Sequence, residues 1–158
     1  MAVFNVGDKI VYPMHGAGVI EAIEEKEILG EKHSYYVLKM PVGDMKVMIP
    51  TDNVESIGIR EVIERSDVDK VYEILQDQNV NVISNWNKRY RENMMKIKSG
   101  NIFEVADVVR TLMIRDREKG LSTGERKMLN SAKQILISEL VLAENRDQSK
   151  IEASIDAV

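Results

Sequence analysis

Residues 84–100 read SNWNKRYRENMMKIKSG and predict a helix of about four turns, around which the second half of the chain is organised. Ser84 or Asn85 can cap the start by accepting hydrogen bonds from the first free N–H groups, and Gly100 is a typical end. One face carries an apolar stripe at helical spacing, formed by Tyr90, Met94 and Ile97. The other faces carry cations: Lys88, Arg89, Arg91, Lys96 and Lys98.

Trp86 is the only tryptophan of the 158 residues and lies in the first turn of this predicted helix. Two interpretations are open. A large ring near a helix end either completes the packing of one helix against another or contacts a molecule outside the protein. The basic neighbours favour the second interpretation.

The first 58 residues are predicted to form strands, because short runs rich in Val, Ile and Tyr alternate with Gly, Pro and Asp. The expected strands are residues 9–12, 19–28, 35–40 and 45–49. Pro41-Val42-Gly43-Asp44 has turn chemistry and joins the last two as a hairpin. So many short strands predict a small, strongly bent sheet or barrel of SH3 or Tudor type, with Tyr35 or Tyr36 in its core.

The chain from Ser66 onward is predicted to be helical. Capping boxes mark two starts, at Asn101 with Glu104 and at Ser122 with Glu125. Further helices are therefore expected over residues 101–119 and 122–145, with a weaker helix or frayed tail over 147–158. The predicted fold class is α+β. The expected order is an SH3/Tudor-like β-barrel (residues 1–58), an acidic connecting helix region (59–83) and an all-helical domain (84–158).

Charge is distributed unevenly along the chain, although the net charge is only −4. Counted by segment, residues 1–60 carry −3, residues 61–83 carry −4, residues 84–133 carry +6 and residues 134–158 carry −3. The positive segment creates a local field that attracts phosphate even in an acidic protein. The alternative is an ordinary solvated helical surface with many salt bridges.

Enzymatic and metal-binding functions find little support in the sequence. There is no cysteine, and His15 and His33 lack the spacing of a zinc site. Gly16-Ala17-Gly18 is followed by no predicted helix, which argues against a dinucleotide site. No segment has the length and hydropathy of a membrane span or a signal peptide. We expect a cytoplasmic, monomeric binding protein without cofactor or metal.

Two sets of motifs resemble the CarD family of bacterial transcription regulators, and together they span roughly residues 3 to 145. The first is the run VGDKIVYPMHGAGVI at residues 6–20. The second occurs in order along the helical half: Asn85-Trp86, Arg89-Tyr90, Ser99-Gly100, Val108-Val109-Arg110, Gly120-Leu121-Ser122, Glu125, Met128-Leu129 and Ala132-Lys133-Gln134-Ile135-Leu136. Transcription-repair coupling factors share the N-terminal module, but this chain has neither the length nor the Walker motif of their translocase.

The resemblance implies a Tudor-like domain that binds the β subunit of RNA polymerase and a helical domain that contacts promoter DNA. In this family a tryptophan matching Trp86 enters the minor groove at the upstream edge of the transcription bubble and hinders reannealing. The resemblance further implies that Lys88, Arg89 and Arg91 hold backbone phosphates without reading sequence. Arg126 and Lys127, at another predicted helix start, are additional candidates for phosphate contacts.

The residues expected to face the polymerase lie on the predicted strands: Lys26, Ile28, Lys46 and Met48. The family often presents arginines on these strands, and lysine lacks the bidentate fork of arginine, so this chain predicts a weaker or rearranged docking surface. An ordinary solvated sheet face is the alternative. A different function also stays open, that of a protein adaptor of the transcription machinery without direct DNA contact.

Overall fold

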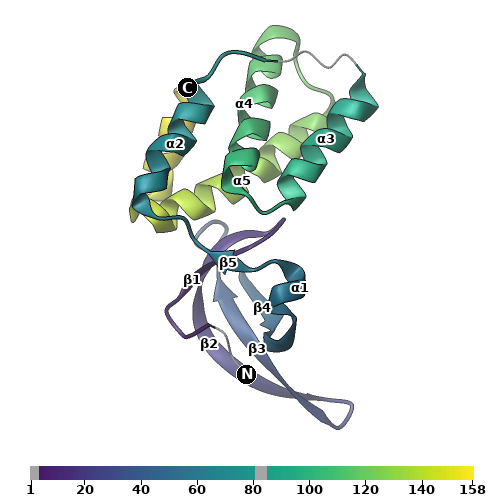
Figure 1. Ribbon diagram of the computed structural model, residues 1–158, viewed down its shortest axis with the longest axis vertical. Coiled ribbons are helices and arrows are strands. Elements are labelled where there is room, and N and C mark those ends of the chain that lie inside the picture. The colour runs from purple at the N-terminus through teal and green to yellow at the C-terminus, as the bar shows by residue number, and fades with distance from the viewer. Residues whose placement is uncertain (1–3, 81–84) are drawn as a thin grey trace.

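A computed structural model describes residues 4–80 and 85–158 and shows an antiparallel sheet stacked against a bundle of helices (Figure 1). The sheet is built from the first part of the chain, and the helices follow it. This arrangement confirms the predicted α+β class and its order, a Tudor-like sheet and then a helical domain.

The sheet has five antiparallel strands in the order β4-β3-β2-β1-β5. Their bounds are Lys9–Tyr12 for β1, Gly16–Ile28 for β2, Glu31–Lys39 for β3, Lys46–Pro50 for β4 and Arg60–Glu61 for β5. The expected closure into a barrel is wrong, because no ladder joins the edge strands β4 and β5 in the described part of the chain. Instead, a short 3-10 turn (Thr51–Asn53) and helix α1 (Val54–Ile57) lead from β4 towards β5, and Val54 packs into the core.

Strands β2 and β3 are longer than predicted and project beyond the sheet as a two-stranded ribbon (Figure 1). The added residues are 16–18 in β2 and 31–34 in β3, and the latter read Glu-Lys-His-Ser, without the apolar alternation that predicts a strand. The predicted end of the sheet is residue 58, but strand β5 lies beyond it, at Arg60–Glu61.

The core of the sheet lies on one face, where Ile10, Ile20, Leu38 and Ile49 are completely buried. Tyr36, not Tyr35, joins them, and its hydroxyl accepts a hydrogen bond from the Phe4 N–H at 3.0 Å. The open alternative between the two tyrosines is thereby resolved.

The helical bundle contains five helices among the described residues, with bounds Arg65–Gln76 for α2, Trp86–Lys98 for α3, Ile102–Lys119 for α4, Thr123–Glu144 for α5 and Gln148–Asp156 for α6. The predicted connecting helix α2 belongs to the bundle, since Val68, Val71 and Leu75 enter its core. Helix α6 is not a frayed tail, because Ile151 and Ile155 are fully buried.

The sheet rests on α5 through the segment that the sequence shows as Gly16-Ala17-Gly18. The Ala17 N–H donates to Ser138 Oγ at 2.8 Å. Gly16 has φ +110°, and a Cβ there would lie 2.7 Å from the same oxygen, so only glycine allows this approach. The glycine-rich run is therefore a packing device between the two parts of the molecule.

An ion pair between the partly exposed Arg60 and the buried Glu139 strengthens the same junction. Arg60 of β5 donates from both terminal nitrogens to the Glu139 carboxylate of α5, each at 2.7 Å. Its Nε donates to the Gly100 carbonyl at 2.8 Å, and the Ile63 N–H donates to Glu139 at 2.9 Å. The sheet, the residues that follow α3 and the C-terminal part of α5 are thus connected through one guanidinium group.

Candidate nucleic-acid interface

Helix α3 begins where the sequence predicts, directly after Asn85. The Asn85 side-chain oxygen accepts a hydrogen bond from the Lys88 N–H at 3.1 Å and so acts as the cap. The alternative cap, Ser84, lies outside the described residues. This cap places Trp86 at the first helical position.

The indole of Trp86 is oriented by contacts on one side and open to solvent on the other. Its ring stacks on Tyr90, with centroids 5.0 Å apart and planes 18° apart. Its N–H donates to Ser122 Oγ at 3.1 Å. Even so, 41% of the residue remains exposed. Packing between helices therefore covers only part of Trp86, and a large part of the residue is exposed in a defined orientation.

The N-termini of α3 and α5 meet at this indole. Ser122 caps α5 by accepting a hydrogen bond from the Glu125 N–H at 3.2 Å, and the same oxygen accepts the indole N–H. Gly124 lies close below, because a Cβ at that position would be 3.5 Å from Trp86. Two helix N-termini carry partial positive charge, which favours anions near the ring.

Arg89 faces the protein rather than solvent. Its guanidinium donates two hydrogen bonds to the carboxylate of Glu125, at 2.7 and 3.0 Å. The Glu125 residue is 1% exposed. One half of the predicted capping box is present, the hydrogen bond from the Glu125 N–H to Ser122 Oγ. In the other half, the Glu125 carboxylate binds Arg89 instead of the backbone at Ser122.

The two partners stabilise each other's charged form. Hydrogen bonding from Arg89 lowers the pKa of Glu125 against the opposing effect of burial, and Arg115 and the Trp86 indole contribute in the same direction. The hydrogen bond to Glu125 likewise raises the pKa of Arg89. Glu125 therefore carries a full negative charge at neutral pH and fixes Arg89 one turn from the indole.

The remaining predicted DNA-contacting cations are exposed. Lys88 and Arg91 share the outer face of α3, and Lys127 lies in the first turns of α5; none makes an ion pair within the described residues. Arg126 is bound to Asp116 at 2.8 Å. Lys88, Arg91 and Lys127 are therefore exposed on the two helices whose N-termini meet at Trp86, while Arg89 and Arg126 are already paired.

The four predicted polymerase-facing residues lie on one face of the sheet, opposite its core. The register pairs Val37 with both Ala22 and Met48, and Lys39 with Lys46, which places the two β4 residues on that face. Lys26 and Ile28 occupy the same face further along the ribbon, paired with His33 and Glu31. Lys46 forms an exposed ion pair with Glu21 at 3.1 Å. The four residues thus form two groups, one at the β4 edge and one on the ribbon.

The ion-pair roles of Glu125 and Glu139 were not predicted from the sequence. Both lie in line with the apolar stripe of α5, where Leu129, Ala132 and Leu136 are buried. An acid on an apolar helix face is a signal for a buried ion pair, because an unpaired buried charge is too costly. Their partners, Arg89 and Arg60, come from distant segments and leave no local pattern.

Other site types find no support in the described ranges 4–80 and 85–158. No group of His, Cys, Asp or Glu residues there could hold a metal ion. No helix there has the length and apolar character needed to cross a bilayer.

Comparison with known proteins gives matches for both parts of the chain. Residues 4–63 match the CarD-like/TRCF RID domain, and residues 70–156 match the C-terminal domain of CarD. The chain is 46% identical over 150 residues to the putative transcription factor YdeB of Bacillus subtilis (strain 168), covering 95% of this chain and 98% of that protein. It is also similar to the structure of CdnLNt from Myxococcus xanthus, with 43% identity, coverage of 40% of this chain and 89% of that chain, and a TM-score of 0.34.

Proposed function

Since the chain belongs to the CarD family of transcription regulators, we propose that it binds RNA polymerase and promoter DNA together and stabilises the open promoter complex. The sheet binds the polymerase β subunit, and the N-termini of α3 and α5 contact DNA at the upstream edge of the bubble. The observation that carries this proposal is the half-exposed indole of Trp86, held in one orientation by Tyr90 and Ser122.

Trp86 acts as a wedge. An aromatic ring inserted from the minor groove replaces the stacking that is lost at a distorted base step. Because Tyr90 and Ser122 already fix the ring, little conformational entropy is lost when it inserts. The supporting contacts leave the outer part of the indole available to a base.

Lys88, Arg91 and Lys127 bind backbone phosphates around the wedge. Their side chains are exposed and make no ion pair with a described residue, so no internal bond has to break on binding. Phosphate contacts position a protein on DNA without reading the sequence. Binding is therefore tolerant of promoter sequence.

The polymerase contact uses the face that carries Lys26, Ile28, Lys46 and Met48. Strand β4 is an edge of the open sheet, so its outer backbone groups have no ladder partner among the described residues. Such an edge can accept a strand from another protein. Ile28 adds an exposed apolar side chain on the ribbon.

No fuel is needed for this function. A protein that binds the open complex more tightly than the closed complex shifts their equilibrium by the difference in affinity. A difference of about 1.4 kcal/mol changes the ratio about tenfold. The same stabilisation helps a promoter limited by melting and impedes one limited by escape.

The test is the lifetime of open complexes on one promoter with wild type and Trp86→Ala. We expect the variant to shorten the lifetime by about tenfold, since a base stacked on an aromatic ring is worth about 1–3 kcal/mol. Met95→Ala is the matched control, because Met95 is an exposed large residue on the same helix. Trp86→Phe should restore part of the lifetime.

An unchanged lifetime with Trp86→Ala would contradict the wedge. If footprinting then showed bubble-edge protection that does not depend on this protein, while polymerase binding persisted, the adaptor function would replace the proposal. The polymerase face is tested separately, by comparing the affinity of Lys26→Glu and Met48→Asp variants with a Lys150→Glu control on α6.

A further inference from the structure

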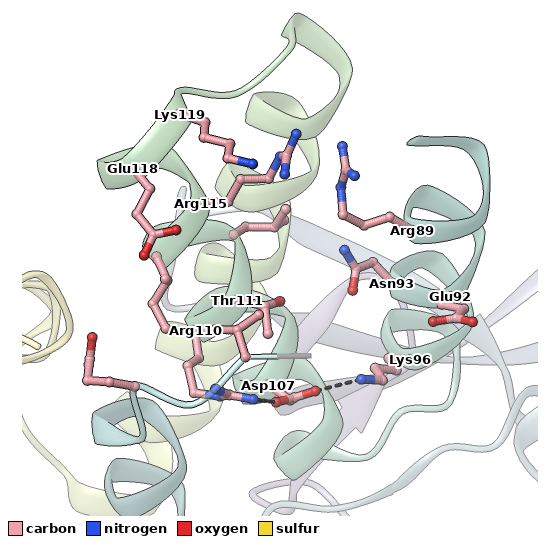
Figure 2. Close-up of a pocket in the computed structure, with 14 residues that line it drawn as sticks. Arg89, Glu92, Asn93, Lys96, Asp107, Arg110, Thr111, Arg115, Glu118 and Lys119 are labelled. Atoms are coloured by element: carbon pink, nitrogen blue, oxygen red, sulfur yellow. Dashed lines mark hydrogen bonds and ion pairs between the residues drawn. The ribbon is translucent and has the colours of Figure 1, made fainter. Parts of the chain in front are cut away.

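A polar cavity of about 370 Å³ lies between α3 and α4, on the inner side of the helix that carries Trp86 (Figure 2). Its walls carry Arg89, Asn93 and Lys96 from α3, which share one helix face, and Thr111 and Arg115 from α4. The volume lies in the range of small-molecule sites. None of the DNA or polymerase contacts proposed above uses this cavity.

The lower end of the cavity holds two cations that are both hydrogen-bonded to one carboxylate. Asp107 accepts hydrogen bonds from Lys96 at 2.6 Å and from Arg110 at 2.5 Å. Burial raises the pKa of Asp107, but these two cations outweigh it and the net change is downward. Lys96 and Arg110 are thus both hydrogen-bonded to Asp107, and the three side chains form the base of the cavity.

The upper end carries three cations, of which only Arg89 is hydrogen-bonded to a carboxylate of a described residue. Arg115 and Lys119 from α4 and Arg89 from α3 point toward the same space (Figure 2). Arg89 and Arg115 share the single carboxylate of Glu125, and the Arg115 Nε is 3.9 Å from it, too far for a hydrogen bond. That Nε is buried without a hydrogen-bond partner. Lys119 lines the cavity as an exposed residue and makes no ion pair with a described residue. Glu92 and Glu118 also line the cavity but bind none of these cations.

Asn93 supplies an independent sign of a ligand. It is only 7% exposed, and its amide lies between the two helices (Figure 2). Its side chain makes no hydrogen bond with another residue that the structure describes. Among the described residues only Arg115 Nε is fully buried without a partner, so the Asn93 amide atoms keep contact with solvent in the cavity. An amide that faces a polar cavity without an internal partner can pair with a ligand that has both donors and acceptors.

We propose that this cavity binds a small phosphorylated metabolite of nucleotide size. Its phosphate binds Arg115 and Lys119, neither of which is hydrogen-bonded to a carboxylate of a described residue, and its polar organic part hydrogen-bonds with Asn93. Guanidinium groups match phosphate oxygens in geometry and charge. Inorganic phosphate alone would leave much of the cavity and the Asn93 amide unfilled.

The experiment is a titration of the ¹⁵N-labelled protein with ADP, and separately with inorganic phosphate and a short DNA duplex, at constant ionic strength. The side-chain amide signals of Asn93 report directly on the cavity. We expect saturable shifts of these signals with ADP, and much weaker binding of inorganic phosphate. Lys119→Ala should weaken ADP binding about tenfold through loss of one charge-assisted contact. Asn93→Ala should also weaken it, with the fold checked by thermal unfolding.

Lys98→Ala is the matched control, since Lys98 is an exposed cation on α3 that does not line the cavity. Equal weakening by Lys98→Ala and Lys119→Ala would show diffuse electrostatic attraction and overturn the proposal. It would also be overturned if ADP caused no saturable shift, if inorganic phosphate bound as tightly as ADP, or if only the DNA duplex shifted the Asn93 signals. No polymerase is present, so this result is independent of the open-complex test.

Discussion

Glu125 is a carboxylate that the fold encloses almost completely, and Arg89 keeps it ionised through two hydrogen bonds. Breaking such a pair by removing one charge leaves the other buried without compensation. Since Arg89 follows Trp86 by three residues on α3, this pair also determines how α3 lies against α5 beside the indole. Arg89 therefore serves the interface by positioning it.

Glu125→Gln is expected to reduce the free energy of unfolding by about 3 kcal/mol at pH 7. The pKa of Glu125 is lowered in the folded protein from an ordinary value of 4.5. The stabilisation is therefore complete above the unfolded pKa and is lost as the pH falls through the lower folded pKa. Urea unfolding at a series of pH values should show the difference from wild type shrinking below about pH 4.5. Glu104→Gln, at an exposed glutamate in the first turn of α4, should show a much smaller difference at every pH.

Lys88 and Arg89 are neighbours with different expected effects on DNA binding. Lys88→Ala should make the negative slope of log affinity against log salt concentration shallower by about one, because one phosphate contact is lost. The stability of the protein should not change. Arg89→Ala should lower the melting temperature instead. Filter binding over a range of salt concentrations, together with thermal unfolding, separates the two. A full salt effect from Arg89→Ala at unchanged stability would assign that residue to DNA after all.

At the scale of elements, α5 connects the two ends of the molecule. Its N-terminal cap Ser122 holds the indole, and Ser138 and Glu139 hold the sheet. Ser138 is fixed in turn, because its hydroxyl donates to the Ile135 carbonyl at 2.7 Å. A Cβ at position 16 would therefore meet a hydroxyl that cannot move away without losing its hydrogen bond.

Gly16→Ala is expected to destabilise the protein by about 2–3 kcal/mol, from the positive φ and the contact with Ser138. Ser138→Ala removes the oxygen that the new Cβ would meet. The double variant should therefore lose less stability than the sum of the two single changes, which denaturant unfolding measures through a double-mutant cycle. Strictly additive losses would contradict the close approach. Gly30→Ala is the control, because Gly30 also has a positive φ but open space around an added Cβ. It should show the backbone cost without the steric contact.

Local patterns allowed much of the architecture to be predicted. The starts of α3, α4 and α5 follow from Asn85, Asn101 and Ser122, since a cap acts over three or four residues. The exposure of Trp86 was expected from its basic neighbours, and the structure shows the ring half exposed, while its contact with DNA stays a prediction. The open sheet, the pairing of Glu125 with Arg89 and the cavity at Asn93 depend on contacts between distant segments. No periodicity of a single segment contains that information.

For the whole molecule, the junction between sheet and bundle rests on Arg60 and Glu139. Arg60→Ala leaves a buried carboxylate with only the Ile63 N–H among its present partners, so we expect a loss of about 3 kcal/mol. Both parts should stay folded while their relative orientation loosens, which small-angle scattering and residual dipolar couplings detect. Open-complex lifetimes should shorten although neither proposed contact surface has changed.

Asp156→Asn is the control for this prediction. It weakens a surface pair between α6 and Lys133 of α5, with a distance of 3.0 Å, and should cost less than about 1 kcal/mol. An unchanged orientation in Arg60→Ala would show that the glycine contact at Ser138 is sufficient for the junction.

The separation of the two ends is set by the length of one helix. Ser122 and Ser138 are sixteen positions apart along α5, which corresponds to about 24 Å at 1.5 Å per residue. Inserting one residue between them would lengthen this span by only about 1.5 Å but would turn the indole about 100° around the axis. The reach between sheet and ring therefore cannot be adjusted in small steps, and insertions or deletions are excluded from this stretch more strictly than substitutions.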